Sequence, residues 1–213
     1  MLTAYRLLLI AFCLLPLCLQ AQDSKTFLQT FVQKMSAQPV LLNFSFEYES
    51  LQQQIKETYE GTALCHSKQF RVLTEKVEVY CDGTTKWVYN VDFDEVMLFP
   101  ATEAYDITDN PLLYIQQHAD DFKYKSTVQR KLEQGKAVLH LDMFPKDKNA
   151  AYISVGLTVD ATTYYPVAIQ YRLKDGQRYT ISVSAFDGKI AAKNNDFIFP
   201  KHKFPTAEVV DLR

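Results

Sequence analysis

Residues 70–90 read FRVLTEKVEVYCDGTTKWVYN, and this stretch decides the fold of the chain. In its segment VEVYC (77–81), apolar and polar residues alternate with the period of a half-buried β-strand. The Asp-Gly pair at 82–83 is typical of a tight hairpin turn, and apolar or aromatic residues at alternate positions resume at Trp87. The stretch predicts two consecutive β-hairpins, in which we expect Val79 and Trp87 to share one apolar face.

The same alternation recurs along most of the chain. It predicts further strands at 42–48, 53–65, 95–99, 122–129, 137–143, 152–159, 166–173 and 179–185, with a short edge at 196–199. Two segments have helical patterns instead. Residues 24–36 carry apolar side chains at helical spacing, and Asn110-Pro111 is a typical start for a short helix that continues toward Asp121. A long antiparallel sheet with two short helices follows from these patterns.

The first 21 residues have the pattern of a secretory signal peptide. One early positive charge precedes an apolar run at 7–19, which is too short to span a membrane, and Ala21 is a suitable cleavage position. We therefore expect cleavage after Ala21 and a soluble exported product. The remaining residues, 22–213, have the length of one domain with a sizeable core.

The cysteines bear on both export and cross-linking. Cys18 follows Leu17, whereas a lipoprotein signal would place a small residue there, so a lipid anchor is disfavoured. Cys65 and Cys81 survive cleavage, and export favours a disulfide between them. However, a strand that begins at Phe70 would lie between theirs, and two strand spacings of about 4.8 Å exceed the limit of about 7 Å between bridged Cα atoms. Export and geometry thus point in opposite directions.

Composition and motifs exclude several classes of function. Cleavage removes one arginine, so the mature chain keeps 22 basic and 25 acidic residues and a net charge of −3. This balance, without basic clusters, argues against binding to nucleic acid or to anionic headgroups. We expect no metal or cofactor, because the mature histidines are scattered and no nucleotide or hydrolase motif occurs. These histidines are His66, His118, His140 and His202.

One cluster of acids, Asp92, Asp94 and Glu95, falls in the connection between two strands. Solvation explains it better than paired-acid catalysis, so we do not expect an enzyme. The more informative feature is that about ten amphipathic strands share only two short helices as cover. Such a sheet either closes into a filled barrel or curls into a half-barrel that keeps an apolar cavity. Alternation alone favours the filled barrel.

Four segments resemble the outer-membrane lipoprotein carrier family, LolA. They are GTALCHSKQFRV (61–72), VEVYCDGTTKWVYN (77–90), DNPLLYI (109–115) and the tail FPTAEVVDLR (204–213). The resemblance covers essentially the whole mature chain and implies a mainly β, α+β fold. This fold is an unclosed antiparallel barrel, a curved sheet of about ten or eleven strands, with an α-helical lid over a hydrophobic cavity. The resemblance therefore favours the open cavity over the filled barrel.

The resemblance also implies a function and a set of partners. The chain would be a monomeric periplasmic chaperone that carries lipoproteins, by their acyl chains, from the inner to the outer membrane. It would receive them from an inner-membrane ATP-driven lipoprotein-releasing complex and pass them to an outer-membrane acceptor. One departure concerns the family's Arg-Pro pair, whose arginine holds the lid shut. His66-Ser67 stand at this point, so the lid must be held by other contacts.

The expected cavity residues are the inward members of the alternating strands: Phe44, Phe46, Val77, Val79, Trp87, Val155, Leu157 and Ile169. The expected lid residues over its mouth are Leu112, Leu113 and Ile115. Three alternatives remain open. An acyl-sensing regulatory domain and an outer-membrane lipoprotein receptor would have the same fold, and an exported lipid-acting enzyme would belong to another class.

Overall fold

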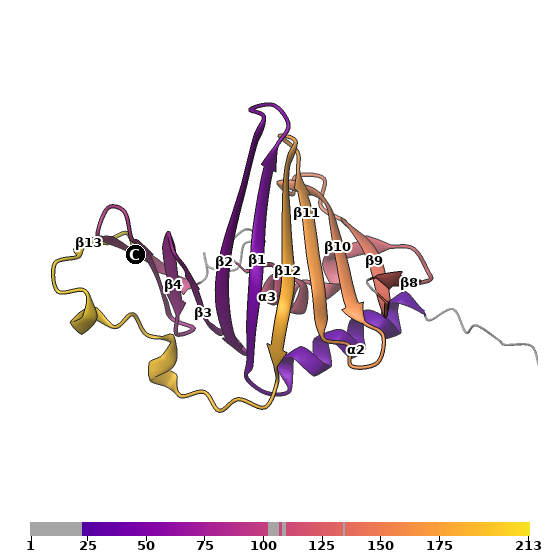
Figure 1. The fold of residues 1–213 in the computed structure, drawn as a ribbon, viewed down its shortest axis with the longest axis horizontal. Coiled ribbons are helices and arrows are strands. Elements are labelled where there is room, and N and C mark those ends of the chain that lie inside the picture. Colours follow the sequence, from indigo (N-terminus) through magenta and orange to yellow (C-terminus); the bar gives the residue numbers. More distant parts are fainter. Residues whose placement is uncertain (1–22, 102–106, 108–109, 134) are drawn as a thin grey trace, which may run out of the picture.

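One curved sheet organises the computed structural model, which describes residues 23–101, 107, 110–133 and 135–213 (Figure 1). Within these residues the sheet has thirteen strands, in the spatial order β13-β6-β5-β4-β3-β2-β1-β12-β11-β10-β9-β7, with β8 paired to β9 outside this path. The two ends of the order do not meet, so the sheet stays open, and only β13 and β6 pair in parallel. The open barrel is confirmed, with more strands than the expected ten or eleven.

The strands are β1 (Val40–Ser50), β2 (Ile55–His66), β3 (Gln69–Thr74), β4 (Val77–Cys81), β5 (Thr85–Asn90), β6 (Glu95–Pro100), β7 (Phe122–Tyr124), β8 (Gln129–Glu133), β9 (Lys136–Pro145), β10 (Tyr152–Asp160), β11 (Pro166–Leu173), β12 (Gln177–Asp187) and β13 (Glu208–Asp211). The strand expected at 122–129 is shorter: β7 ends at Tyr124, and a separate strand, β8, begins at Gln129. The edge expected at 196–199 is wrong, because residues 194–197 form a 3-10 turn.

The stretch at 70–90 forms β3, β4 and β5, as predicted. Gly83 has a φ of 93°, and the side chain of Asp82 accepts hydrogen bonds from the N–H groups of Thr84 and Thr85 at 2.7 and 2.8 Å. The N–H of Asp82 also donates to the carbonyl of Thr85, so only two residues separate the paired positions. Odd positions of β4 consequently pair with even positions of β5.

This register corrects the expected position of Trp87. Val79 pairs with Val88, and Trp87 pairs with Tyr80. Because paired residues point to the same face of a sheet, Trp87 lies on the convex face and Val88 takes the concave position. The prediction failed because the alternation was continued through a turn that reverses it.

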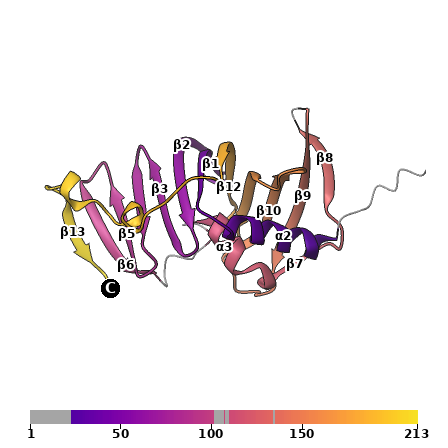
Figure 2. The ribbon, with the colours of Figure 1, turned by 90° about the horizontal axis from the view of Figure 1, so that it is seen from below.

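Helix α2 (Ser24–Ser36) covers one half of the concave face. Asp23 caps its start by accepting a hydrogen bond from the N–H of Thr26 at 3.0 Å, and this bond lowers the pKa of the Asp23 carboxyl. One side of the helix is buried in the main core: Phe27, Leu28, Phe31 and Met35. Figures 1 and 2 both show that α2 runs across the row of strands from β12 to β9. The helix predicted at 24–36 is confirmed, and it fills this half of the sheet.

The C-terminal segment covers the opposite face of the other half. After β12 the chain runs back beneath β3–β6 through two 3-10 turns, Asn194–Phe197 and Lys201–Lys203, before it adds β13 to the edge (Figure 2). Tyr80 and Tyr89 each contact the ring of Phe199 at 5.7 Å between centroids. Trp87 packs against this cluster. The tail is therefore a second cover, on the convex face.

The remaining helix, α3 (Pro111–Gln117), begins at the predicted Asn110-Pro111 and is followed by a 3-10 turn at Ala119–Asp121. The cysteine geometry is also as argued: Phe70 pairs with Cys65 on one side and with Cys81 on the other, so β3 separates the two thiols. Cys81 donates a weak hydrogen bond to the carbonyl of Lys68 at 3.8 Å. The expected signal peptide lies outside the described residues.

Candidate functional site

A largely apolar cavity of about 470 Å³ lies on the concave face, lined by β1–β5, β11 and β12 and by the start of α3. Its wall is formed by side chains from seven strands and by the start of α3. The lining residues are Leu42, Phe44, Phe46, Tyr59, Ala63, Cys65, Val72, Thr74, Lys76, Val77, Val79, Val88, Asn110, Pro111, Leu112, Pro166, Ile169, Ile181 and Val183. No side chain of α2 is among them, so the cavity begins where the cover of that helix ends.

The strand register explains why these side chains meet. Phe44 pairs with Val183 and Phe46 with Ile181 across β1 and β12, and Val79 pairs with Val88 across β4 and β5. Each pair points to one face, so successive strands supply a continuous apolar wall. The cavity is thus the space over the concave face of the sheet that no side chain of α2 fills.

Gly61 provides part of the space at the bend of β2. A Cβ atom at this position would lie 2.6 Å from Cζ of Phe44 and 2.8 Å from the carbonyl oxygen of Leu73. Real Cβ atoms do not approach other atoms so closely. The ring of Phe44 can therefore lie against the backbone of β2 because residue 61 has no side chain.

The polar groups of the cavity lie at its two ends. Lys76, whose side chain is half exposed, borders one end and forms an ion pair of 3.2 Å with Asp92. Tyr59 borders the same half of the wall and donates a very short hydrogen bond to Glu57, which raises the pKa of the Tyr59 hydroxyl. Asn110 borders the cavity from the lid and is buried. The cavity therefore has an apolar body, a charged exposed end and a buried neutral end.

At the buried end, Asn110 joins the lid helix to the wall. Its Oδ1 accepts a hydrogen bond from the N–H of Leu113 at 3.0 Å and so caps α3. Its Nδ2 donates to the sulfur of Cys65 on β2 at 3.7 Å. Burial raises the pKa of the Cys65 thiol to about 11, although the bond from Asn110 opposes this shift. This amide–thiol contact joins the start of α3 to β2 of the wall.

Six of the residues predicted from the sequence border this cavity: Phe44, Phe46, Val77, Val79 and Ile169 on the strands and Leu112 on the lid. Five do not. Trp87 lies on the convex face for the reason given above. Val155 and Leu157 do lie on the concave face, but they are fully buried in the core that α2 completes. Leu113 and Ile115 are buried in the same core, so only the first turn of the lid faces the cavity.

Sequence reasoning missed several wall residues that the same alternation contains. Ile181 and Val183 alternate on β12, and Val72 occupies the concave position of β3 opposite Val79. Extending each alternating series to its cross-strand partners would have found them. By contrast, no local pattern identifies Lys76 and Asn110, because a turn and a cap bring them to the ends of the cavity.

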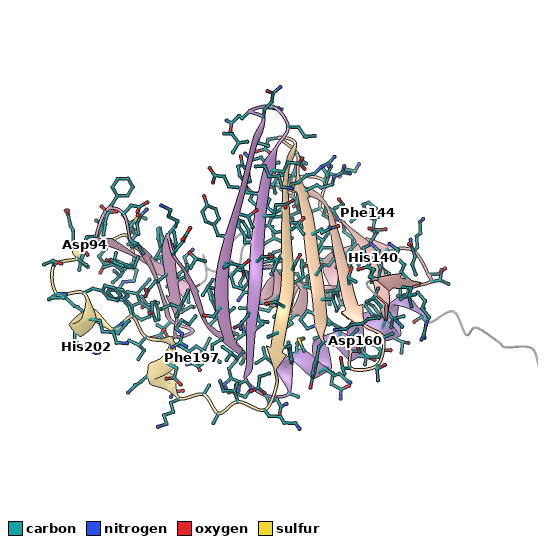
Figure 3. The ribbon with its side chains drawn as sticks, in the orientation of Figure 1. Asp94, His140, Phe144, Asp160, Phe197 and His202 are labelled. Atoms are coloured by element: carbon teal, nitrogen blue, oxygen red, sulfur yellow. The ribbon has the colours of Figure 1, made fainter. Side chains whose placement is uncertain are left out.

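Clusters that could support other chemistry lie elsewhere. Over the described ranges, no group of three or more His, Cys, Asp or Glu side chains could hold a metal ion. His140 accepts or donates hydrogen bonds to Thr158 at 2.8 Å and to Asp142 at 3.1 Å. These residues lie on β9 and β10, and none of them lines the cavity; Figure 3 labels His140. In the part of the chain that the structure covers, no helix has the length and apolarity to cross a membrane.

Several solved structures are similar to this chain. An uncharacterized conserved protein from Thermus thermophilus has a TM-score of 0.58 at 12% identity, with 89% of this chain and 99% of that chain covered. A putative outer membrane lipoprotein-sorting protein domain from Vibrio parahaemolyticus has a TM-score of 0.47 at 10% identity, with 84% and 97% covered. A LolA superfamily protein from Nitrosomonas europaea has a TM-score of 0.45 at 10% identity, with 84% and 99% covered.

The sequence itself gives the family assignment. No curated protein matches the chain. The family model of the outer membrane lipoprotein carrier protein LolA, in contrast, matches residues 42–200, which include every residue that lines the cavity. The chain therefore belongs to the LolA family.

Proposed function

We propose that this protein is a periplasmic carrier that holds the acyl chains of lipoproteins in the cavity and shuttles lipoproteins from the inner to the outer membrane. The observation that carries the proposal is the apolar cavity of about 470 Å³ on the concave face of a LolA-family sheet. Its volume lies within the range of about 300–1,000 Å³ of pockets that enclose small ligands. A lipid anchor is the ligand class that such an apolar wall suits.

Energetics support a cavity that is only partly closed. Each buried methylene contributes about 0.8 kcal/mol, so an anchor with several acyl chains resists leaving a bilayer by tens of kcal/mol. The cavity must offset most of this cost, but an equal or larger gain would prevent release. Val77 and Val79 are half-buried on the cavity wall. They are apolar surface that a ligand would cover and then uncover again.

The proposed cycle needs a donor and an acceptor. An inner-membrane ATP-driven lipoprotein-releasing complex would load the carrier, and an outer-membrane acceptor would unload it. A signal peptide cleaved after Ala21 would bring the chain to the periplasm. No hydrolytic step is required, because the anchor is transferred and not cut.

Binding of a synthetic triacylated lipopeptide to the mature protein tests the proposal. Val79→Asp should weaken binding at least tenfold, because an acyl chain would bury its carboxylate without a partner. Ile153→Asp is the matched control: it places the same charge on a strand, but on the exposed position 153 of β10, outside the cavity. Equal binding by the two variants, or no binding by the wild-type protein, would refute the proposal.

A transfer assay separates a carrier from the alternatives. Donor vesicles that contain the labelled lipopeptide are mixed with acceptor vesicles, with and without the protein. A carrier speeds the transfer and releases intact lipopeptide. A regulatory domain or a fixed receptor would bind without transfer, and an enzyme would release a shortened product.

A further inference from the structure

The turn between β5 and β6 exposes an aromatic ring. Phe93 is 79% exposed, the largest value among the large hydrophobic side chains of the described residues, and Val91 beside it is 40% exposed. Asp92 and Asp94 stand on either side of Phe93 in the chain. An exposed ring between two carboxylates costs hydration free energy and contributes nothing to the core. The ring is therefore accessible to a binding partner.

Hydrogen bonds hold this turn in one conformation. The side-chain oxygen of Asn90 accepts from the N–H groups of Asp92 and Phe93 at 3.1 and 3.3 Å. The hydroxyl of Tyr89 donates to the carboxylate of Asp94 at 2.9 Å, and Asp94 itself has a φ of 50°. The backbone that carries Phe93 is thus fixed before any partner arrives. Such preorganisation lowers the entropic cost of binding.

Two neighbouring elements brace the turn from outside and place it beside the cavity. The N–H of Glu208, at the start of β13, donates to the carbonyl of Asp94 at 2.9 Å. On the other side, Lys76 pairs with Asp92 at 3.2 Å and also borders the exposed end of the cavity. Figure 3 shows Asp94 at the edge of the sheet that ends in β13. Asp92, the neighbour of Phe93 in the chain, is thus linked by an ion pair to a residue that lines the cavity, whereas Phe93 is not itself a lining residue.

We propose that Phe93 is the anchor by which a protein partner docks at the rim, inserting into an apolar socket surrounded by basic side chains. Rigid aromatic side chains are frequent energetic hot spots of protein interfaces. The carboxylates of Asp92 and Asp94 complement lysine and arginine around such a socket. A bilayer fits less well, since anionic headgroups repel these carboxylates.

This docking surface goes beyond the proposed function, and its test does not depend on acyl binding. The probes are membrane vesicles from cells that make the protein, the same vesicles after protease treatment, and liposomes of their extracted lipids. Mature wild-type protein, Phe93→Ser and Leu132→Ser are compared at low and high salt. Leu132 is the matched control, because it is 75% exposed on β8, at the far end of the sheet.

The proposal predicts that the wild-type protein binds untreated vesicles and that Phe93→Ser binds about thirtyfold more weakly, a typical loss at a hot spot. Leu132→Ser should bind like the wild-type protein, and added salt should weaken binding. Both variants should keep the wild-type unfolding temperature and lipopeptide affinity, so a failure of acyl binding would be seen separately.

Four results would overturn the proposal. The first is that the wild-type protein does not bind the vesicles, and the second is that Phe93→Ser binds them as tightly as the wild-type protein. The third is equal binding to protein-free liposomes. The fourth is that the wild-type protein self-associates through Phe93 and does not bind the vesicles. The third would assign the ring to the bilayer and the fourth to a second copy of the chain.

Discussion

The two halves of the sheet carry their covers on opposite faces. In the half formed by β9 and β10, α2 packs on the concave face, and Val155 and Leu157 are fully buried there. In the half formed by β3–β6, the C-terminal segment packs on the convex face against Tyr80 and Tyr89. Val79 on the concave face of this second half is only half-buried and borders the cavity.

The comparison shows that the position of the covers makes the cavity. Val79 and Val155 have the same residue type and point to the same face of the same sheet. What differs is the element opposite each of them, since α2 lies over Val155 and a cavity lies over Val79. One sheet can therefore be a packed core at one end and a ligand-binding surface at the other.

The largest expected effect comes from removing part of the concave cover. Phe31 of α2 is completely buried, and Phe31→Ala should lower the free energy of unfolding by about 3–5 kcal/mol, because a large side chain leaves a cavity in a packed core. Urea unfolding measures the loss. Phe93→Ala removes the same ring from an exposed turn and should change stability by no more than about 0.5 kcal/mol. Similar losses of unfolding free energy in the two variants would contradict the conclusion that α2 covers a packed core.

The next largest effect is a loss of stability at high pH, which follows from the buried Cys65 thiol on the cavity wall. The pKa of the Cys65 thiol is raised from 9.0 to about 11 in the folded protein, so the unfolded state loses this proton first as the pH rises. The contribution of Cys65 to stability is therefore complete below pH 9 and falls between pH 9 and 11. At about 1.4 kcal/mol per pKa unit, the loss is about 3 kcal/mol.

Urea unfolding at pH 8 and pH 11, for the wild-type protein and for Cys65→Ala, isolates this contribution from that of the tyrosines. The wild-type protein should lose more stability than the variant between the two pH values. An equal loss in both proteins would mean that the thiol is hydrated, and hence that α3 does not seal this end of the cavity.

Two tryptophan substitutions compare the halves directly. Leu157→Trp should cost about 1–3 kcal/mol, since the packed half has no space for a larger side chain. Val79→Trp should be nearly neutral in stability, because the ring enters the cavity, and should weaken lipopeptide binding by occupying it. Thermal unfolding and binding are measured on both variants. If Val79→Trp destabilises as much as Leu157→Trp, the two halves are packed alike.

The sequence predicts most of the strands, the start of both helices and part of the wall, because these depend on local features. The alternation at 77–81, the Asp82-Gly83 turn and the cap-proline pair Asn110-Pro111 each act over a few residues. The assignment of Trp87 to the concave face was wrong because the pairing register of β4 and β5 was off by one residue. The two-residue turn at Gly83-Thr84 sets this register and could have been used to predict it. Local information was sufficient in principle for that position.

Other features depend on contacts between distant segments. Nothing near Val155 or Leu157 indicates that α2, more than a hundred residues earlier in the chain, packs over them. Phe199 likewise reaches Tyr80 and Tyr89 only in the folded chain. The sequence therefore predicts that a residue points inward, but not whether an open cavity or a packed core lies inside.

The smallest expected effect on stability concerns the contact between the start of α3 and β2. Asn110→Ser keeps a good helix cap but removes the amide that donates to the sulfur of Cys65, so global stability should fall by about 1 kcal/mol or less. The backbone amides of Leu113 to Gln117 should exchange faster with deuterium, because the start of α3 is no longer held to β2. Mass spectrometry of deuterium uptake measures this change. Unchanged uptake would show that packing alone holds the lid.

The most direct test of the central claim needs no substitution. Methyl-labelled protein is titrated with the triacylated lipopeptide, and chemical shifts of valine, leucine and isoleucine methyl groups are followed by NMR. The account predicts large shifts at Val72, Val79 and Ile181 on the cavity wall and small ones at Val155 and Leu157 in the packed half. Uniform shifts in both halves, or no shifts at the wall residues, would contradict it.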